Sequence, residues 1–150
     1  MQNDKKEDLI KLAIKEAEKA FEQGNAPFGA VLADENGNVI ATAYNTAHTD
    51  KDPTAHAEIN LIRKVAKDLD ESEFAKLYLV SNAQSCTMCF SAAIKAGIKN
   101  FIFGADSKKD MSPSLNVYEM AKYTREKPKI ESGILKDECE KLIKVWEENR

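Results

Sequence analysis

Hydrophobic positions along the chain alternate between helical and strand-like spacing. The first apolar residues recur at helical spacing until Gly24, which predicts a helix from about Lys5 to Gln23. Two short apolar runs follow, Gly29 to Asp34 and Val39 to Asn45, and they predict strands. The Asn36-Gly37 dipeptide between them favours a type I′ turn, so the two strands are expected to pair as an antiparallel hairpin.

The rest of the pattern combines helices with further strands. It predicts a helix, a strand, a second helix, another strand and a weak fifth strand, over Thr54 to Leu69, Leu77 to Asn82, Ser85 to Ala96, Phe101 to Ala105 and the surroundings of Ile130. A last helical stripe contains Leu135, Cys139, Leu142, Ile143 and Trp146, and it predicts a buried, unreactive thiol at Cys139. Because helical crossovers join parallel strands, we expect an α/β protein with a mixed sheet packed against helices.

Two short motifs carry the candidate chemistry. His56-Ala57-Glu58 stands near the start of one predicted helix, and Cys86 and Cys89 stand at the start of the next. Two cysteines three positions apart project from the same side of a first helical turn, so one metal ion can bind both. Zinc suits two thiolates and an imidazole, and with three protein ligands its fourth position stays open for water. A redox-active cysteine pair is the alternative, but it leaves His56 and Glu58 without a role.

The motifs and their flanks resemble the zinc-dependent deaminases of the cytidine deaminase superfamily, which share an H-x-E and C-x-x-C signature. Asp52 to Ile59 is similar to the first zinc motif of bacterial guanine deaminases and tRNA adenosine deaminases. Pro27 to Val31 resembles their first strand, and Phe101 to Ala105 resembles the strand after their second zinc helix. Gly133 to Cys139 is similar to the start of the last helix in the tRNA enzymes. The resemblance therefore covers nearly the whole chain.

This resemblance implies a fold, a cofactor and a reaction. The fold is a three-layer α/β/α sandwich around a mixed sheet of about five strands. The cofactor is one zinc ion per chain, held by His56, Cys86 and Cys89, which lowers the pKa of a bound water so that hydroxide attacks the amino-bearing carbon of a base. Glu58 lies two positions beyond His56, so it is free to carry the proton from water to a ring nitrogen while ammonia leaves.

Three further residues are candidates for substrate binding. Asn45 matches a family asparagine at the end of the second strand that hydrogen-bonds the base; the alternative is an asparagine that only closes a turn. The resemblance places the backbone N–H of Ala57 against the base. Phe28 either stacks near the ring or belongs to the core.

One departure from the family pattern lies beside the first cysteine. The family usually has Glu-Pro there, and this chain has Gln84-Ser85. Proline is favourable but replaceable at the first position of a helix, and we expect the Ser85 hydroxyl to cap the helix instead. The departure bears on the choice of substrate, because it changes a wall of the pocket.

Composition and charge limit the kinds of partner that this chain can have. The chain has 150 residues, of which 43% are hydrophobic, so we expect one domain over residues 1–150. It lacks both a membrane-length apolar run and the apolar stretch of a signal peptide, and only Cys139 is left once zinc takes two of the three cysteines. A cytoplasmic protein without membrane association is therefore expected.

The substrate is the most open question. With 22 Lys and Arg against 25 Asp and Glu, the chain lacks the positive balance that suits tRNA, so a small nucleobase or nucleoside is the favoured partner. Guanine is preferred because Phe28 resembles the guanine enzymes, and cytosine or a related aminopyrimidine or aminotriazine would suit the same site. A tRNA adenosine-to-inosine deaminase and a non-catalytic zinc-stabilised binding module are the alternatives.

Two further features bear on the substrate and the partners. One basic segment, Lys122 to Lys129, either contacts a nucleic-acid backbone or is a solvated surface. Asp106 and Asp110 follow the fourth predicted strand, where α/β sites usually lie, and are candidates for contact with the base. A homodimer is expected from the family resemblance.

Overall fold

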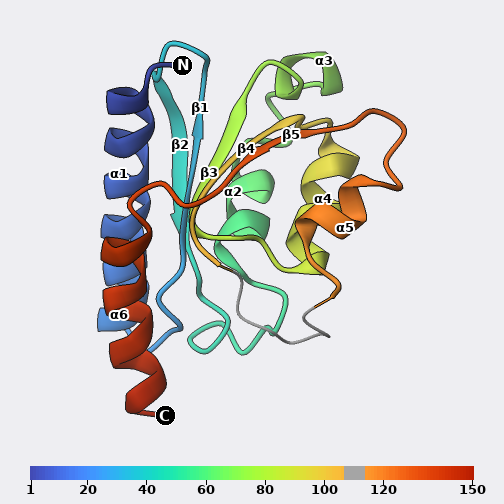
Figure 1. Cartoon of the computed structure of the whole chain (residues 1–150). Coiled ribbons are helices and arrows are strands. Elements are labelled where there is room, and N and C mark those ends of the chain that lie inside the picture. Colours follow the sequence, from blue (N-terminus) through green and yellow to red (C-terminus); the bar gives the residue numbers. More distant parts are fainter. Residues whose placement is uncertain (107–113) are drawn as a thin grey trace.

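The computed structural model describes residues 1–106 and 114–150 (Figure 1). In chain order the elements are α1 (Asn3–Glu22), β1 (Gly29–Ala33), β2 (Val39–Tyr44), α2 (Ala57–Val65), α3 (Glu71–Phe74), β3 (Tyr78–Ala83), α4 (Thr87–Ala96), β4 (Asn100–Ala105), α5 (Val117–Ala121), β5 (Lys129–Glu131) and α6 (Lys136–Glu148). The helices and strands expected from the apolar pattern are all present, with ends shifted by a few residues.

The five strands form one mixed sheet in the order β2-β1-β3-β4-β5. β1 pairs antiparallel with both β2 and β3, whereas β3, β4 and β5 run parallel to one another. The parallel strands are those joined through helices, because a crossover is needed to return the chain to the same end of the sheet. Their carboxyl ends therefore meet at one end of the sheet, close to the starts of α2 and α4 (Figure 1).

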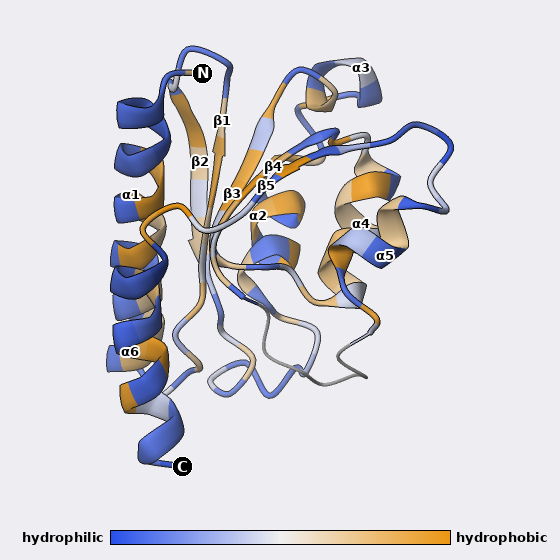
Figure 2. Cartoon of the chain, in the orientation of Figure 1, coloured by the Kyte–Doolittle hydropathy of each residue, from blue (hydrophilic) through white to orange (hydrophobic). Residues whose placement is uncertain are grey.

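Helices cover both faces of the sheet, which confirms the three-layer α/β/α arrangement. α1 and α6 lie on one face and α2, α4 and α5 on the other (Figure 1). Neighbouring residues of a strand point to opposite faces, so Val31 packs with the α1 side and Leu32 with the α2 side. Figure 2 shows hydrophobic strands between helices whose surfaces are largely hydrophilic. In the described part of the chain, no helix combines the length and apolar character needed to cross a membrane.

The β1–β2 hairpin is present, but its turn is not of the expected type. A type I′ turn needs positive φ at both central residues, and of Asn36 and Gly37 only Gly37 has one, at +84°. The N–H of Gly37 donates to the carbonyl of Asp34 at 3.0 Å, which closes a turn from Asp34 to Gly37. The Asp34 carboxylate also accepts from the N–H groups of Asn36 and Asn38, each at 2.9 Å. This carboxylate stabilises a type I turn followed by a left-handed glycine, with a bulge between Leu32 and Ala33.

The two helices that carry the zinc motifs begin later than predicted. α2 starts at Ala57 instead of Thr54, because the Asp52 carboxylate accepts from both the N–H of Thr54 at 2.9 Å and its hydroxyl at 2.7 Å and so holds a turn there. α4 starts at Thr87 and ends as expected at Gly97, whose φ is +110°. The short helices α3 and α5 were not predicted, because four or five residues carry too little apolar repeat to be recognised.

Gly104 lies where α6 meets the sheet, and its lack of a side chain is required there. A Cβ at this position would overlap Cys139 Sγ and the carbonyl oxygen of Asn82. We expect Gly104→Ala to lower the free energy of unfolding by about 1–3 kcal/mol, because neither neighbour has space to move in a close-packed interior. Urea unfolding measures this loss. Adding Cys139→Ala should restore part of it, and equal stability of Gly104→Ala and the wild-type protein would contradict the packing described.

Candidate active site

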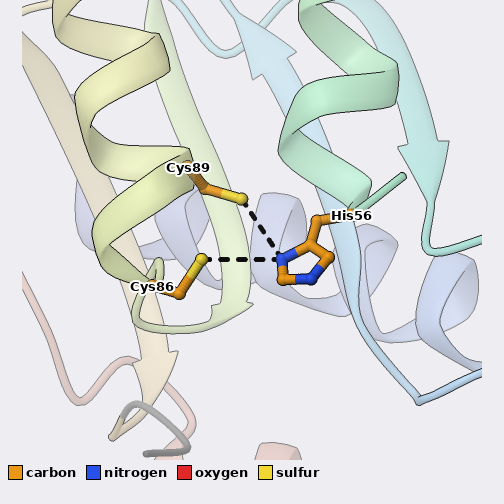
Figure 3. A group of neighbouring side chains, drawn as sticks. All are labelled: His56, Cys86 and Cys89. Carbon is orange, nitrogen blue, oxygen red and sulfur yellow. Dashed lines mark hydrogen bonds between the residues drawn. The ribbon is translucent and has the colours of Figure 1, made fainter. Parts of the chain in front are cut away.

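The three expected zinc ligands meet at the carboxyl end of the parallel strands. His56 and Cys86 are the residues immediately before α2 and α4, and Cys89 lies in the first turn of α4 (Figure 3). The Nδ1 atom of His56 lies 3.5 Å from Cys86 Sγ and 3.4 Å from Cys89 Sγ. Two motifs thirty residues apart therefore face one another, because both helices start at the same end of the sheet.

The spacing of these three donor atoms fits a zinc ion. A tetrahedral zinc with nitrogen at about 2.0–2.1 Å and sulfur at about 2.3 Å places those two atoms about 3.5 Å apart. The ligand atoms of His56, Cys86 and Cys89 all lie within 4.8 Å of one another, and this is the cluster of metal-binding groups found among the described residues. Three ligands of this kind leave a fourth position for water, which is typical of a catalytic zinc site.

The two sulfurs interact strongly. A hydrogen bond from Cys89, with a further contribution from His56, lowers the pKa of Cys86 to about 4. The same pairing, together with burial, raises the pKa of Cys89. Cys86 is therefore a thiolate near neutral pH, and binding of zinc requires Cys89 to lose its proton as well.

Glu58 lies in the first turn of α2, one residue inside the helix from Ala57, and its side chain is buried. Loss of solvent raises the pKa of its carboxyl group, and the hydrogen bond from Ser85 opposes that rise. A carboxylate kept from water beside a zinc site can exchange protons with a bound substrate. Glu58 lines the same cavity as His56 and Cys86, and its role as proton carrier stays a prediction.

A cavity of about 170 Å³ opens beside the ligands. Its lining residues are Ala26, Phe28, Asn45, His56, Glu58, Ser81, Ala83, Gln84, Cys86 and Trp146. This volume is below the roughly 300–1,000 Å³ of pockets for drug-sized ligands, so it suits a small planar ring. Asn45 and Phe28 both line the cavity, while the side chain of Ala57 is buried in the core on the α2 side.

Asn45 closes a turn at the wall of the cavity, and its contact with a base stays a prediction. Its Oδ1 atom accepts from the N–H of Ala47 at 2.8 Å, as expected for an asparagine that closes a turn. Its own N–H donates to the carbonyl of Phe28 at 3.0 Å, which ties the ends of β1 and β2 together beside the cavity. Asn45 is thus held rigidly at the wall of the pocket.

Sequence reasoning missed several lining residues. Trp146 was placed on the apolar stripe of the last helix, yet its indole lines the cavity and meets the ring of Phe28 edge to face, with centroids 5.9 Å apart. Ser81 also lines the cavity, and its hydroxyl donates to the carbonyl of Gly29 at 3.0 Å. No spacing in the sequence relates these residues to the zinc motifs. The unusual Gln84-Ser85 pair was the only available signal, and both residues contact the site.

The expected cap by Ser85 is not formed. Cys86 is the residue that precedes α4, and no side-chain hydrogen bond caps this helix. The Ser85 hydroxyl donates to Oε2 of Glu58 at 2.7 Å instead. A buried carboxylate is a strong acceptor for a hydroxyl proton, so the Ser85 side chain turns toward Glu58 instead of toward the start of α4.

Asp106 and the basic segment are not among the residues that line the cavity. Asp106 is exposed and pairs with Lys136 at 3.2 Å, and Asp110 lies outside the described residues. The basic segment ends at Lys129, the first residue of β5, which pairs with Asn100 at the start of β4. These are the amino ends of the parallel strands, so the segment lies at the end of the sheet opposite to the site (Figure 1).

Fold and site together define a zinc-dependent deaminase, a hydrolase that acts on C–N bonds. The chain belongs to the family described as the cytidine and deoxycytidylate deaminase zinc-binding region, whose model matches residues 3–105. This match confirms the resemblance and the zinc cofactor expected from the two motifs.

Similar proteins include enzymes that act on tRNA. The tRNA-specific adenosine deaminase of Haemophilus influenzae is 31% identical over 145 residues, which cover 96% of this chain and 84% of that protein. A solved structure from studies of A-to-I editing by tRNA:A34 deaminases at the wobble position is 32% identical, with a TM-score of 0.77, and covers 89% of this chain and 97% of its own. A guanine deaminase structure from Nitrosomonas europaea covers 93% of this chain and 83% of its own with a TM-score of 0.81, but at 22% identity it shows the fold alone.

Proposed function

We propose that this protein deaminates adenosine in tRNA to inosine, with water as the co-substrate and ammonia as the second product. The observation that carries the proposal is the near full-length similarity to tRNA-specific adenosine deaminases, at 31% identity over 96% of the chain in the Haemophilus influenzae protein. This reverses the preference for a free base that the net charge suggested. Overall charge is a weak guide here, because tRNA contacts depend on a local surface and not on the sum over the chain.

The residues of the site have distinct parts in this reaction. His56, Cys86 and Cys89 would hold the zinc ion, which supplies Lewis-acid activation of a water molecule when bound. Glu58 accepts a proton from the attacking water and passes it to the ring nitrogen beside the amino-bearing carbon. After the oxygen has bonded to the ring carbon, Glu58 takes the remaining proton of that hydroxyl and passes it to the departing amino group. The C–N bond then breaks and a C=O group remains on the ring.

Substrate binding in this proposal rests on three residues. Asn45 and the backbone N–H of Ala57 would hydrogen-bond the base, and Phe28 would form the apolar wall against which the ring lies. The rigid placement of Asn45 by its contacts with Ala47 and Phe28 supports its part in this arrangement.

A substrate panel tests the proposal. Ammonia release by the zinc-loaded protein is measured with an anticodon stem-loop RNA carrying adenosine at the wobble position, and with free guanine, cytosine, isocytosine, adenine and their nucleosides. The expected result is turnover of the RNA, with inosine found in the product digest. Turnover of a free base with an inert RNA would overturn the proposal and identify the alternative substrate.

A free-base deaminase is the second candidate, and the shape of the pocket favours it. Phe28 and Trp146 contact each other and both line the cavity, and its small volume suits a base without an attached sugar. The exposed basic segment lies at the other end of the sheet and so gives no support to an RNA path near the pocket. Guanine remains the first base to test.

A substitution at Trp146 tests whether the indole at the pocket wall contacts the base. We expect Trp146→Ala to raise the KM of the substrate by about tenfold with a smaller change in kcat, because an aromatic contact with a base is worth about 1–3 kcal/mol. Steady-state kinetics measure the two constants separately. Val145→Ala is the control, since Val145 is 44% exposed on the same helix and does not line the cavity. Equal KM values for Trp146→Ala and the wild-type protein would exclude contact between the indole and the base.

The proposal also covers the domain organisation and the oligomeric state of the protein. We propose that residues 1–150 form one domain, which is supported by the packing of α6 against α1 and β4. We also propose a homodimer, on the basis of the family resemblance. Light scattering of the zinc-loaded protein tests this assembly.

A further inference from the structure

Ser85 makes a contact with Glu58 that the family signature does not include. Its hydroxyl donates to Oε2 of Glu58 at 2.7 Å, across 27 positions of sequence. Both residues are buried, with 3% of Ser85 and 5% of Glu58 exposed. Family members usually carry proline at this position, and a proline side chain has no donor to offer. The hydrogen bond is therefore particular to chains with a hydroxyl here.

The geometry gives this bond a use in the reaction. A carboxylate that carries protons must keep one oxygen aimed at the substrate, and a carboxylate that is free to rotate loses that alignment. The hydrogen bond from Ser85 to Oε2 restrains rotation of the carboxylate. Glu58 also lines the cavity, so this restraint acts on a carboxylate beside the place where a base would bind.

The donor is itself held in place by the loop between β3 and α4. The N–H of Gln84 donates to the carbonyl of Ala105 at 2.9 Å, which anchors the loop to the end of β4. The Gln84 amide donates to Ser132 Oγ at 3.2 Å, and the hydroxyl of Tyr118 donates to the same atom at 2.9 Å. Ser85 stands between Gln84, which is anchored by these bonds, and Cys86 at the start of α4, so its backbone has little freedom.

We propose that Ser85 is a positioning residue for deamination, which holds the Glu58 carboxylate in the orientation needed for proton transfer. It acts through Glu58 and does not touch the reacting atoms. The loop that supplies the ligand Cys86 thus also orients the proton carrier, and a single segment sets both parts of the site.

Kinetics of three variants test this role, with the wobble-adenosine stem-loop and free guanine as the substrates assayed. We expect Ser85→Ala to lower kcat by about tenfold, in line with the loss of one hydrogen bond to a charged group, with KM and zinc content unchanged. Ser85→Thr keeps a hydroxyl and should recover most of kcat. Ser91→Ala is the matched control, because Ser91 is exposed on α4 and away from the cavity lining. Loss of zinc in Ser85→Ala, or equal kcat values in Ser85→Ala and the wild-type protein, would overturn the proposal.

A second measurement needs no substrate. If the hydroxyl serves Glu58, the fall in melting temperature caused by Ser85→Ala should disappear when Glu58 is already alanine. A crystal structure of zinc-loaded Ser85→Ala should show a rotated Glu58 carboxylate with His56, Cys86 and Cys89 unmoved. An equal fall in melting temperature in both backgrounds, or an unmoved carboxylate, would assign Ser85 to the fold alone.

Discussion

Glu58→Gln is expected to lower kcat by about 10²–10⁴-fold while one zinc ion stays bound to each chain. The amide has nearly the shape of the carboxylate and can still accept a hydrogen bond from Ser85, so the site should keep its geometry. It cannot take a proton from water at neutral pH, and both proton transfers to the base then fail. Ammonia release and zinc content, measured on the same preparation, check the two halves of this prediction.

Glu7→Gln is the control for this variant, because it makes the same change at an exposed position of α1. It should match the wild-type protein in both measurements. If Glu58→Gln kept wild-type turnover, another group would have to carry the proton. A non-catalytic zinc module would tolerate the variant as well, but such a module has no use for a carboxylate buried beside its metal.

Cys89→Ala is expected to abolish both zinc binding and turnover. Cys89 is fully buried in the first turn of α4 and contributes one of the three donor atoms, so its loss leaves two ligands for the metal. The loss of zinc affinity should exceed the roughly 10–100-fold that removal of an outer-shell partner costs. A competition titration against a zinc chelator measures the affinity, and ammonia release measures the turnover.

Cys139→Ala is the matched control for the loss of a buried thiol. Cys139 lies on α6, is 1% exposed and packs against β4, away from the cavity lining. Its variant should keep one zinc ion and full activity, with a small loss of stability. Zinc bound equally well by Cys89→Ala and Cys139→Ala would show that the metal lies elsewhere.

The metal site could be predicted from sequence because each of its parts is local. Cys86 and Cys89 are one helical turn apart, and His56 and Glu58 share another short motif. The pattern of apolar residues also predicted the order of strands and helices, since burial on one face imposes a period of two or 3.6 residues. Local rules were less reliable where a side chain intervened, as at the turn of the first hairpin, where the Asp34 carboxylate accepts from two backbone N–H groups.

The sequence by itself determined the fold class and the three residues of the metal site, because these follow from short spacings and from the alternation of apolar positions, and it predicts Glu58 as the proton carrier. Only the tertiary structure decided that Ser85 serves Glu58 instead of capping α4, and that Trp146 reaches the pocket from the last helix. It also decided that the basic segment lies at the end of the sheet opposite to the site. These relations join residues from 27 to more than a hundred positions apart, and no local period encodes where the sheet brings such residues together.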